Sequence, residues 1–159
     1  MAHQIRFRPI DAFRDRQTII DFRKDSYIVS FGSADELGDE EMYVAWIAMA
    51  ATMAPEAFVL MECNGRPIGQ MELEVIYYKG RPIGYVDLFY LIPEFRGRGY
   101  GKIQLDYAEN YFKSHQLNEY HLRVSPTNHR ALRFYKKHGM TQLETEHLTK
   151  TVIRMKKLI

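Results

Sequence analysis

The chain has 159 residues, of which 46% are apolar and 26% charged, and its formal net charge is +2. This composition is typical of a folded globular protein and excludes long disordered stretches, while the charge is too small to indicate a nucleic-acid or membrane partner by itself. The single cysteine, Cys63, cannot form an internal disulfide, and no secretion signal or membrane span stands out, so we expect a cytoplasmic protein.

The first elements along the chain are predicted to be one strand and two helices. Alternating apolar residues predict the strand at 5–9, and apolar residues at helical spacing predict helices at 15–29 and 40–53. No repeat or linker interrupts the chain, so we expect a single domain over residues 1–159.

The middle of the chain changes to the period of β-strands. Apolar or alternating runs predict three strands at 57–63, 67–78 and 84–92. The dipeptides NG at 64–65 and KG at 79–80 separate them, and Asn-Gly best supplies the positive φ angles of a tight hairpin turn. The three strands are therefore predicted to form an antiparallel meander.

The second half alternates helices and strands. The same spacing rules predict a helix at 102–115, a strand at 120–124, a helix at 128–137 and a closing hairpin at 141–148 and 151–155. The predicted order is β-α-α-β-β-β-α-β-α-β-β. This order indicates an α/β fold with a mixed, mostly antiparallel sheet flanked by helices.

The run RGRGYG at 96–101 lies between a predicted strand and a predicted helix. Glycines allow backbone N–H groups to converge on an anion, and a helix N-terminus adds free N–H groups and partial positive charge. Taken alone, the run is equally consistent with a sharp turn that binds nothing. It lacks the Ser or Thr of a P-loop after Lys102 and the spacing of a dinucleotide-binding motif, and it is far shorter than a disordered RNA-binding tract.

A second segment makes this pattern specific. The run at 96–101 is similar to the Arg/Gln-x-x-Gly-x-Gly/Ala signature of the GNAT superfamily of N-acetyltransferases. The segment NHRALRFYKKHGM at 128–140 resembles the family's Asn-x-x-Ala-x-x-Phe-Tyr-x-x-x-Gly-Phe, with Met140 in place of the final aromatic residue. The predicted order of elements also agrees with the GNAT fold over nearly the whole chain.

The resemblance implies that acetyl-CoA binds as the acyl-donor cosubstrate along the strand that ends at residue 92, with its pyrophosphate on the glycine run. A backbone N–H near Leu91 would stabilise the charge that develops on the acetyl oxygen. No metal site is expected. The expected acetyl-CoA-binding residues are Phe89, Tyr90, Leu91, Arg96, Gly97, Arg98, Gly99, Tyr100, Gly101, Lys102, Asn128 and Tyr135.

Two residues are expected to carry the chemistry. Tyr135 occupies the family's position for protonating the departing CoA thiolate, although a tyrosine there also suits packing of a helix on a sheet. Asp87 precedes the expected pantetheine-binding positions on the same strand, and it is the first candidate to take the proton of the attacking amine. A solvated strand end explains Asp87 nearly as well. The fallback candidates are Glu72, Glu74, His121 and His129, and a water relay is the alternative to a side-chain base.

The main indication of the acceptor in the sequence is a cluster of negative charge. Acidic residues crowd the segment 35–41, which suits a cationic amine and equally suits a helix start enriched in acids. We expect an N-acetyltransferase that moves an acetyl group to a primary amine of a small molecule or peptide by direct attack in a ternary complex. The alternative is a non-catalytic acyl-CoA-binding sensor. The family also allows a homodimer, whereas neither a nucleic-acid nor a membrane partner is expected.

Overall fold

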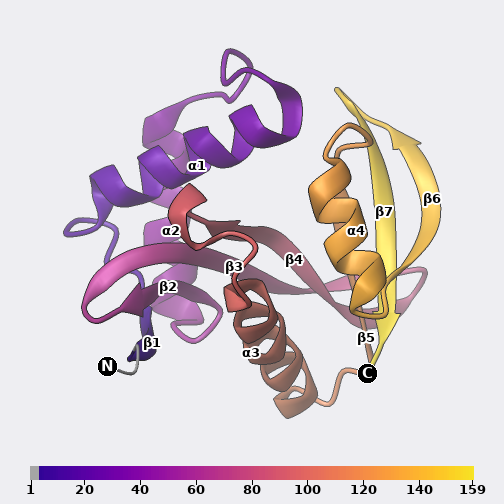
Figure 1. The fold of residues 1–159 in the computed structure, drawn as a ribbon. Coiled ribbons are helices and arrows are strands. Elements are labelled where there is room, and N and C mark those ends of the chain that lie inside the picture. Colours follow the sequence, from indigo (N-terminus) through magenta and orange to yellow (C-terminus); the bar gives the residue numbers. More distant parts are fainter. Residues whose placement is uncertain (1–3) are drawn as a thin grey trace.

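The computed structural model describes residues 4–159, which fold around one seven-stranded sheet (Figure 1). The strands lie in the order β1-β2-β3-β4-β5-β7-β6, and β4 and β5 form the only parallel pair among the strands of this range. The predicted order of strands and helices is confirmed, with boundaries shifted by a few residues. In chain order the elements are β1 (Ile5–Pro9), α1 (Arg16–Phe31), α2 (Glu40–Met53), β2 (Phe58–Cys63), β3 (Arg66–Tyr78), β4 (Arg81–Leu91), the 3-10 helix η1 (Pro93–Phe95), α3 (Tyr100–Ser114), β5 (Glu119–Val124), α4 (His129–Lys137), β6 (Thr141–His147) and β7 (Thr151–Leu158).

Two tight turns fix the meander of β2, β3 and β4. Asn64 and Gly65 have φ angles of 52° and 84°, and Lys79 and Gly80 have φ angles of 50° and 80°. Positive φ at both central residues is the geometry that two-residue hairpins prefer, because its twist matches that of the strands. Both turns predicted from the sequence are therefore confirmed.

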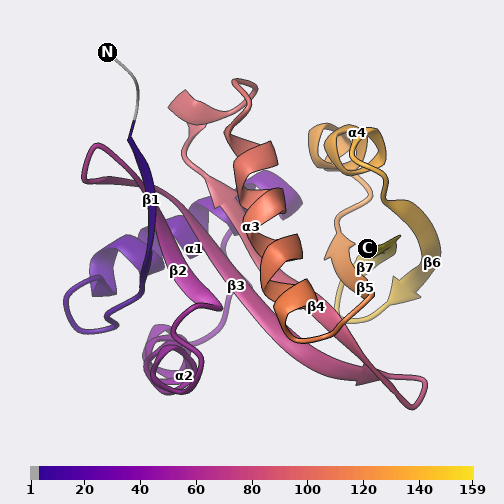
Figure 2. The same ribbon diagram turned by 90° about the horizontal axis from the view of Figure 1, so that it is seen from below.

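Helices cover both faces of the meander. Figure 2 shows α1 and α2 on one face and α3 on the other. All six residues of β2 are buried, as expected for a strand covered on both faces. Ile19 and Ile47 from the first face, and Leu105 and Phe112 from the second, belong to one core. Gly84 allows α3 to lie close to β4, because a Cβ atom there would be 2.6 Å from the Phe112 ring.

The sheet opens where β4 and β5 part. Their parallel pairing extends only from Gly84 to Val86 of β4. Two consecutive residues of β3 pair with Val86 and Leu88, which leaves Asp87 between them as the extra residue of a β-bulge. A bulge bends its strand. The end of β4 is therefore free of β5, and this split positions the candidate site.

In the range 4–159, no helix is both long enough and apolar enough to cross a membrane.

Candidate active site

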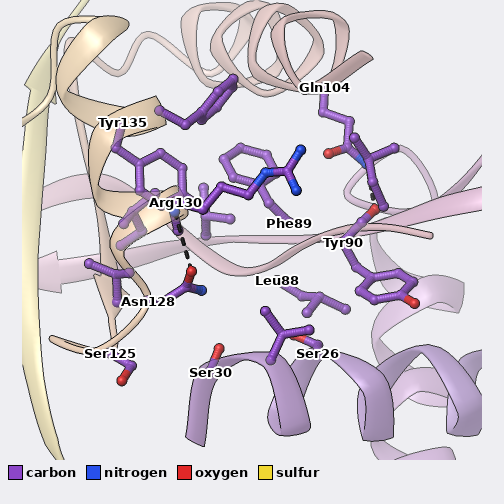
Figure 3. Close-up of a pocket in the computed structure, with 18 of the residues that line it drawn as sticks. Ser26, Ser30, Leu88, Phe89, Tyr90, Gln104, Ser125, Asn128, Arg130 and Tyr135 are labelled. Carbon is purple, nitrogen blue, oxygen red and sulfur yellow. Dashed lines mark hydrogen bonds between the residues drawn. The ribbon is translucent and has the colours of Figure 1, made fainter. Parts of the chain in front are cut away.

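A cavity of about 790 Å³ occupies the split between β4 and β5 (Figure 3). Its walls come from the second half of α1, from β4, from the glycine run and from the start of α4. Of the residues expected to bind acetyl-CoA, all but Arg98 and Tyr100 line this cavity. Arg98 instead donates a hydrogen bond to the Glu94 carbonyl at 2.9 Å, and the Tyr100 ring packs on Phe95 with centroids 5.0 Å apart.

The glycine run forms a turn that requires glycine for two reasons. Gly97 and Gly99 have φ angles of 72° and 91°, in the left-handed region that side chains disfavour. A Cβ atom on Gly97 would lie 2.6 Å from the Arg130 guanidinium, and one on Gly101 would lie 3.0 Å from the Phe134 ring. The run therefore keeps its backbone open to a ligand and lets α4 approach closely.

The first turn of α3 has the properties of an anion site. The helix begins at Tyr100, two residues earlier than predicted, so that Gly101 lies inside it. Its N-cap residue, Gly99, has no side chain to accept from the first N–H groups. The N–H groups of this turn and the positive end of the helix dipole suit a pyrophosphate. Lys102 adds a cation, and its ammonium group is paired with Asp106 at 2.5 Å.

Arg96 and Tyr90 line the cavity but use their polar groups to hold β4 against α1. Arg96 donates from Nε to the Leu91 carbonyl and from Nη2 to the Asp25 carboxylate, both at 2.8 Å. The Tyr90 hydroxyl donates to the same carboxylate at 2.5 Å. The positive charge of Arg96 is therefore already paired, which leaves the backbone N–H groups and Arg130 as the better donors for a phosphate.

Arg130 and Gln104 also line the cavity, although neither is among the residues predicted from the sequence. Gln104 is only 3% exposed, and its Nε2 donates to the Tyr90 carbonyl at 2.8 Å (Figure 3). The sequence could have indicated Gln104 as a site residue, because it is a polar residue four positions before the apolar Ala108 and therefore on the buried side of α3. The signal for Arg130 is a basic side chain in the first turn of the second motif helix.

The N-cap and the last turn of α4 present Asn128 and Tyr135, respectively, to the cavity (Figure 3). Asn128 caps the helix, because its Oδ1 accepts from the Ala131 N–H at 3.2 Å. Tyr135 lies across the split from Phe89, with ring centroids 6.4 Å apart. Burial raises the pKa of Tyr135, so its hydroxyl stays protonated at neutral pH and can donate. The residues in 4–159 offer this hydroxyl no hydrogen-bond partner.

A second cavity of about 580 Å³ adjoins the first on the side of α2. Its outer wall consists of Gly38, Asp39, Met42 and Trp46. The two cavities adjoin at the residues that line both of them, and we call this place the junction. Within the described chain, the residues that line both cavities are Arg23, Tyr43, Glu72 and Asp87.

Glu72 is a buried carboxylate at this junction. It is 4% exposed, and its Oε2 accepts from the Tyr43 hydroxyl at 2.5 Å and from Gln70 Nε2 at 2.8 Å. Burial raises the pKa of Glu72 to about 7, although these hydrogen bonds and the charge of Arg23 act in the opposite direction. Glu72 therefore changes charge near neutral pH, as proton-transfer groups do.

Asp87 reaches the junction from the bulge of β4. Part of its surface remains exposed, yet the surrounding atoms desolvate its carboxylate. This desolvation, followed by the nearby carboxylates of Glu74 and Glu72, raises the pKa of Asp87 well above its ordinary range. Glu74 lines neither cavity, and it acts on the site through its charge, which raises the pKa of both Asp87 and Glu72.

The two histidine candidates lie outside both cavities. His121 is fully buried, with Nε2 2.5 Å from Glu119 and Nδ1 2.7 Å from the Arg154 guanidinium. Burial lowers the pKa of His121, so it is neutral and joins β5 to β7 as a structural group. Among residues 4–159, no group of three or more His, Cys, Asp or Glu side chains is placed to hold a metal ion.

Most acids of the segment 35–41 hold local structure. Asp39 caps α2 by accepting from the first N–H groups of that helix. Glu40 is paired with Lys24 at 2.8 Å, and Glu36 with Lys150 at 3.0 Å. These contacts favour the interpretation of the acidic run as a helix start over that of an amine-binding surface.

Known proteins match this chain in sequence. The model of the acetyltransferase (GNAT) family matches residues 10–140. An uncharacterized N-acetyltransferase of Methanocaldococcus jannaschii is 29% identical over 107 residues, a match that covers 65% of this chain and 46% of that protein. The chain thus spans less than half the length of this relative.

Solved structures share the fold. The PaiA N-acetyltransferase from Thermoplasma acidophilum, in complex with coenzyme A, is 22% identical with a TM-score of 0.75, covering 98% of this chain and 99% of that one. Arabidopsis thaliana Naa50, in complex with the bisubstrate analogue CoA-Ac-MVNAL, is 18% identical with a TM-score of 0.71, covering 96% and 97%. Because the family model matches most of the sequence and the fold agrees over nearly all of it, the chain belongs to the GNAT family of acetyltransferases.

Proposed function

We propose that the protein transfers an acetyl group from acetyl-CoA to a primary amine of a small molecule or peptide, by direct attack in a ternary complex. The observation that carries this proposal is the continuity of the site. The main cavity runs from the glycine run past Tyr135 to the junction at Glu72 and Asp87. A sensor that only bound an acyl-CoA would need the first part alone, whereas transfer to an amine also needs a proton acceptor at the far end.

The residues present fit acetyl-CoA. The glycines at 97–101, the N-terminus of α3 and the cation of Arg130 suit its pyrophosphate. Beyond Val86 the backbone of β4 is free of β5, so it can pair with the amides of the pantetheine arm as with another strand. When bound, acetyl-CoA supplies the thioester that the amine attacks. Asn128, at the start of α4, lines the same cavity and adds a polar group there.

Two groups stabilise the charges that develop during transfer. The backbone N–H near Leu91 donates to the acetyl oxygen. Tyr135 donates to the departing thiolate, and its raised pKa determines whether it transfers its proton or only shares it in a hydrogen bond. A thiol has a pKa of about 8.5 and an ordinary tyrosine about 10, so complete proton transfer from a tyrosine with a still higher pKa is uphill. Tyr135 therefore acts mainly as a hydrogen-bond donor.

Asp87 accepts the proton of the incoming amine. It reaches the junction from the bulge, next to the free end of β4 along which the thioester would lie. Because its pKa is raised, Asp87 is a stronger base once ionised, and its ionised fraction increases with pH. Glu72, with a pKa of about 7, is the second candidate for this role.

An amine panel with acetyl-CoA tests the function directly. CoA release is followed with a thiol reagent, and the mass of each amine is measured in the same reaction. We expect acetylated amine and CoA in equal amounts. Acetyl-CoA that raises the melting temperature but is not consumed with any amine would support the sensor instead.

A further inference from the structure

Arg23 is held firmly at the junction, yet one of its donors is unused. Its Nη2 donates to the Leu37 carbonyl at 2.8 Å, and its guanidinium carbon lies 4.2 Å from the centre of the Tyr43 ring. Its Nη1 is buried and has no hydrogen-bond partner within residues 4–159. A buried donor without an acceptor is unfavourable, and native proteins usually satisfy such groups. Arg23 lines both cavities, so an acceptor oxygen in the junction would satisfy this donor once the guanidinium turns it toward the cavity.

The distance from Arg23 to the nearest buried carboxylate limits the size of such a ligand. The Tyr43 ring lies under the guanidinium, and its hydroxyl bonds Glu72. The guanidinium carbon of Arg23 lies 4.2 Å from the ring centre, and the Tyr43 hydroxyl lies 2.5 Å from Glu72. With half the length of a phenol added, these distances limit the separation of the guanidinium and the Glu72 carboxylate to roughly 10 Å. Arg23 and Glu72 are therefore close enough to be bridged by one small molecule or one residue.

An α-amino group with its own carbonyl oxygen has a reach of the same order as this limit. Standard bond lengths place these two atoms at most about 3.6 Å apart. Adding a hydrogen bond of about 2.9 Å at each end gives roughly 9 Å. An amine at the carboxylates can thus present its carbonyl or carboxylate oxygen to Arg23 without spanning a longer chain.

The outer wall of the second cavity selects the rest of the acceptor. Met42 is 73% exposed there, and Trp46 lies one helical turn further along α2. The carboxylate of Asp39 on the same wall is already engaged as a helix cap. This wall suits an apolar side chain, while the positive charge of Arg23 disfavours a second cationic group.

We propose that the acceptor is an apolar α-amino acid residue whose carbonyl or carboxylate oxygen is bound by Arg23, with its side chain against Met42 and Trp46. The residue is either a free amino acid or the N-terminal residue of a peptide. This assignment rests on the acetyl transfer proposed above and narrows its substrate class. An α-amine also has a pKa of about 8, against about 10.4 for a lysine side chain, so far more of it is neutral and reactive at pH 7.

Phenylalaninamide and 2-phenylethylamine test the role of the oxygen, because they share the apolar ring and the amine and differ in the carbonyl group. With kcat/KM calculated on the neutral fraction of each amine, because the two amines differ in pKa, we expect a ratio in favour of phenylalaninamide of roughly ten- to hundredfold, the effect of one hydrogen bond to a charged donor. Arg23→Met should bring this ratio close to one, with the KM for acetyl-CoA unchanged. Arg23→Lys, which keeps the charge but loses the planar fork, should give an intermediate ratio.

Two further arms and a control complete the experiment. Free phenylalanine and the dipeptide Phe-Ala distinguish a carboxylate from a peptide carbonyl as the bound oxygen. Lys113→Met removes an exposed cation at the end of α3 and should leave the ratio unchanged. Thermal melting of each variant shows that it is folded.

The outcomes separate this assignment from the proposed function. Equal kcat/KM of the wild type for the neutral forms of both amines, or an equal loss on both in Arg23→Met, would overturn the role of Arg23 and leave acetyl transfer standing. If no amine is acetylated, including spermidine and a lysine side-chain analogue, both the assignment and the transferase function are wrong.

Discussion

The buried carboxyl group of Glu72 makes the stability of the fold depend on pH. Its pKa is raised from 4.5 to about 7 by burial beneath Tyr43. Since one pKa unit corresponds to about 1.4 kcal/mol, this shift corresponds to about 3 kcal/mol. The folded state holds the proton more tightly than the unfolded chain does. The stabilisation is therefore complete below a pH of about 4.5, and it is lost as the pH rises through about 7.

Glu72→Gln isolates this contribution, because glutamine can still accept the Tyr43 hydrogen bond but cannot ionise. The free energy of unfolding is measured by urea denaturation at several values between pH 4 and pH 8. The wild type should lose about 3 kcal/mol relative to Glu72→Gln over this range. Glu144→Gln, at an exposed position of β6, should follow the wild type. If the free energies of unfolding of the wild type and Glu72→Gln change with pH in parallel, Glu72 has the same pKa in the folded and the unfolded state. That result would refute the interpretation of Glu72 as a buried base at the junction.

Three further variants test the donor site and the chemistry. Tyr135→Phe should lower kcat by roughly a hundredfold while calorimetry shows acetyl-CoA affinity unchanged, and an equal kcat would remove Tyr135 from the reaction. Gly99→Val should weaken acetyl-CoA binding. Gly65→Val strains a similar positive φ angle in a distant hairpin and should leave acetyl-CoA binding unchanged. Equal affinities of the two variants for acetyl-CoA would contradict the role of the glycine run in binding the pyrophosphate. With an acceptor amine that stays neutral throughout, kcat/KM should rise with pH above neutrality, and Asp87→Asn should abolish this rise. A rise that survives in Asp87→Asn and disappears in Glu72→Gln would assign the base to Glu72.

The fold could be predicted where the signals are local. The turns at 64–65 and 79–80 follow from residues that accept positive φ angles, and these turns set the meander. The start of α3 is harder to predict, because Gly101 is a poor helix former and lies in the first turn of the helix. The bulge at Asp87 has no local signature, since it depends on how β4 pairs with β3.

The donor half of the site could be predicted because the glycine run and the helix that follows it are contiguous in the chain. The acceptor half could be predicted only in part. Asp87 and Glu72 are candidate bases from the sequence, but their junction with Arg23 and Tyr43 is not predictable, because Arg23, Tyr43 and Glu72 come from three elements and meet only in the folded protein. Charge counting also misleads where pairing is distant. Arg96 counts as a phosphate-binding cation in the sequence, but its guanidinium is paired with Asp25, 71 positions earlier in the chain.

Acetyl transfer itself is the most direct test of the function proposed for this site. The purified protein is incubated with acetyl-CoA and phenylalaninamide, and CoA release and the mass of the amine are followed in one reaction. The predicted result is one acetylated amine for each CoA released, with a much slower reaction in Tyr135→Phe. Acetyl-CoA that binds while every amine of the panel remains unmodified would contradict it.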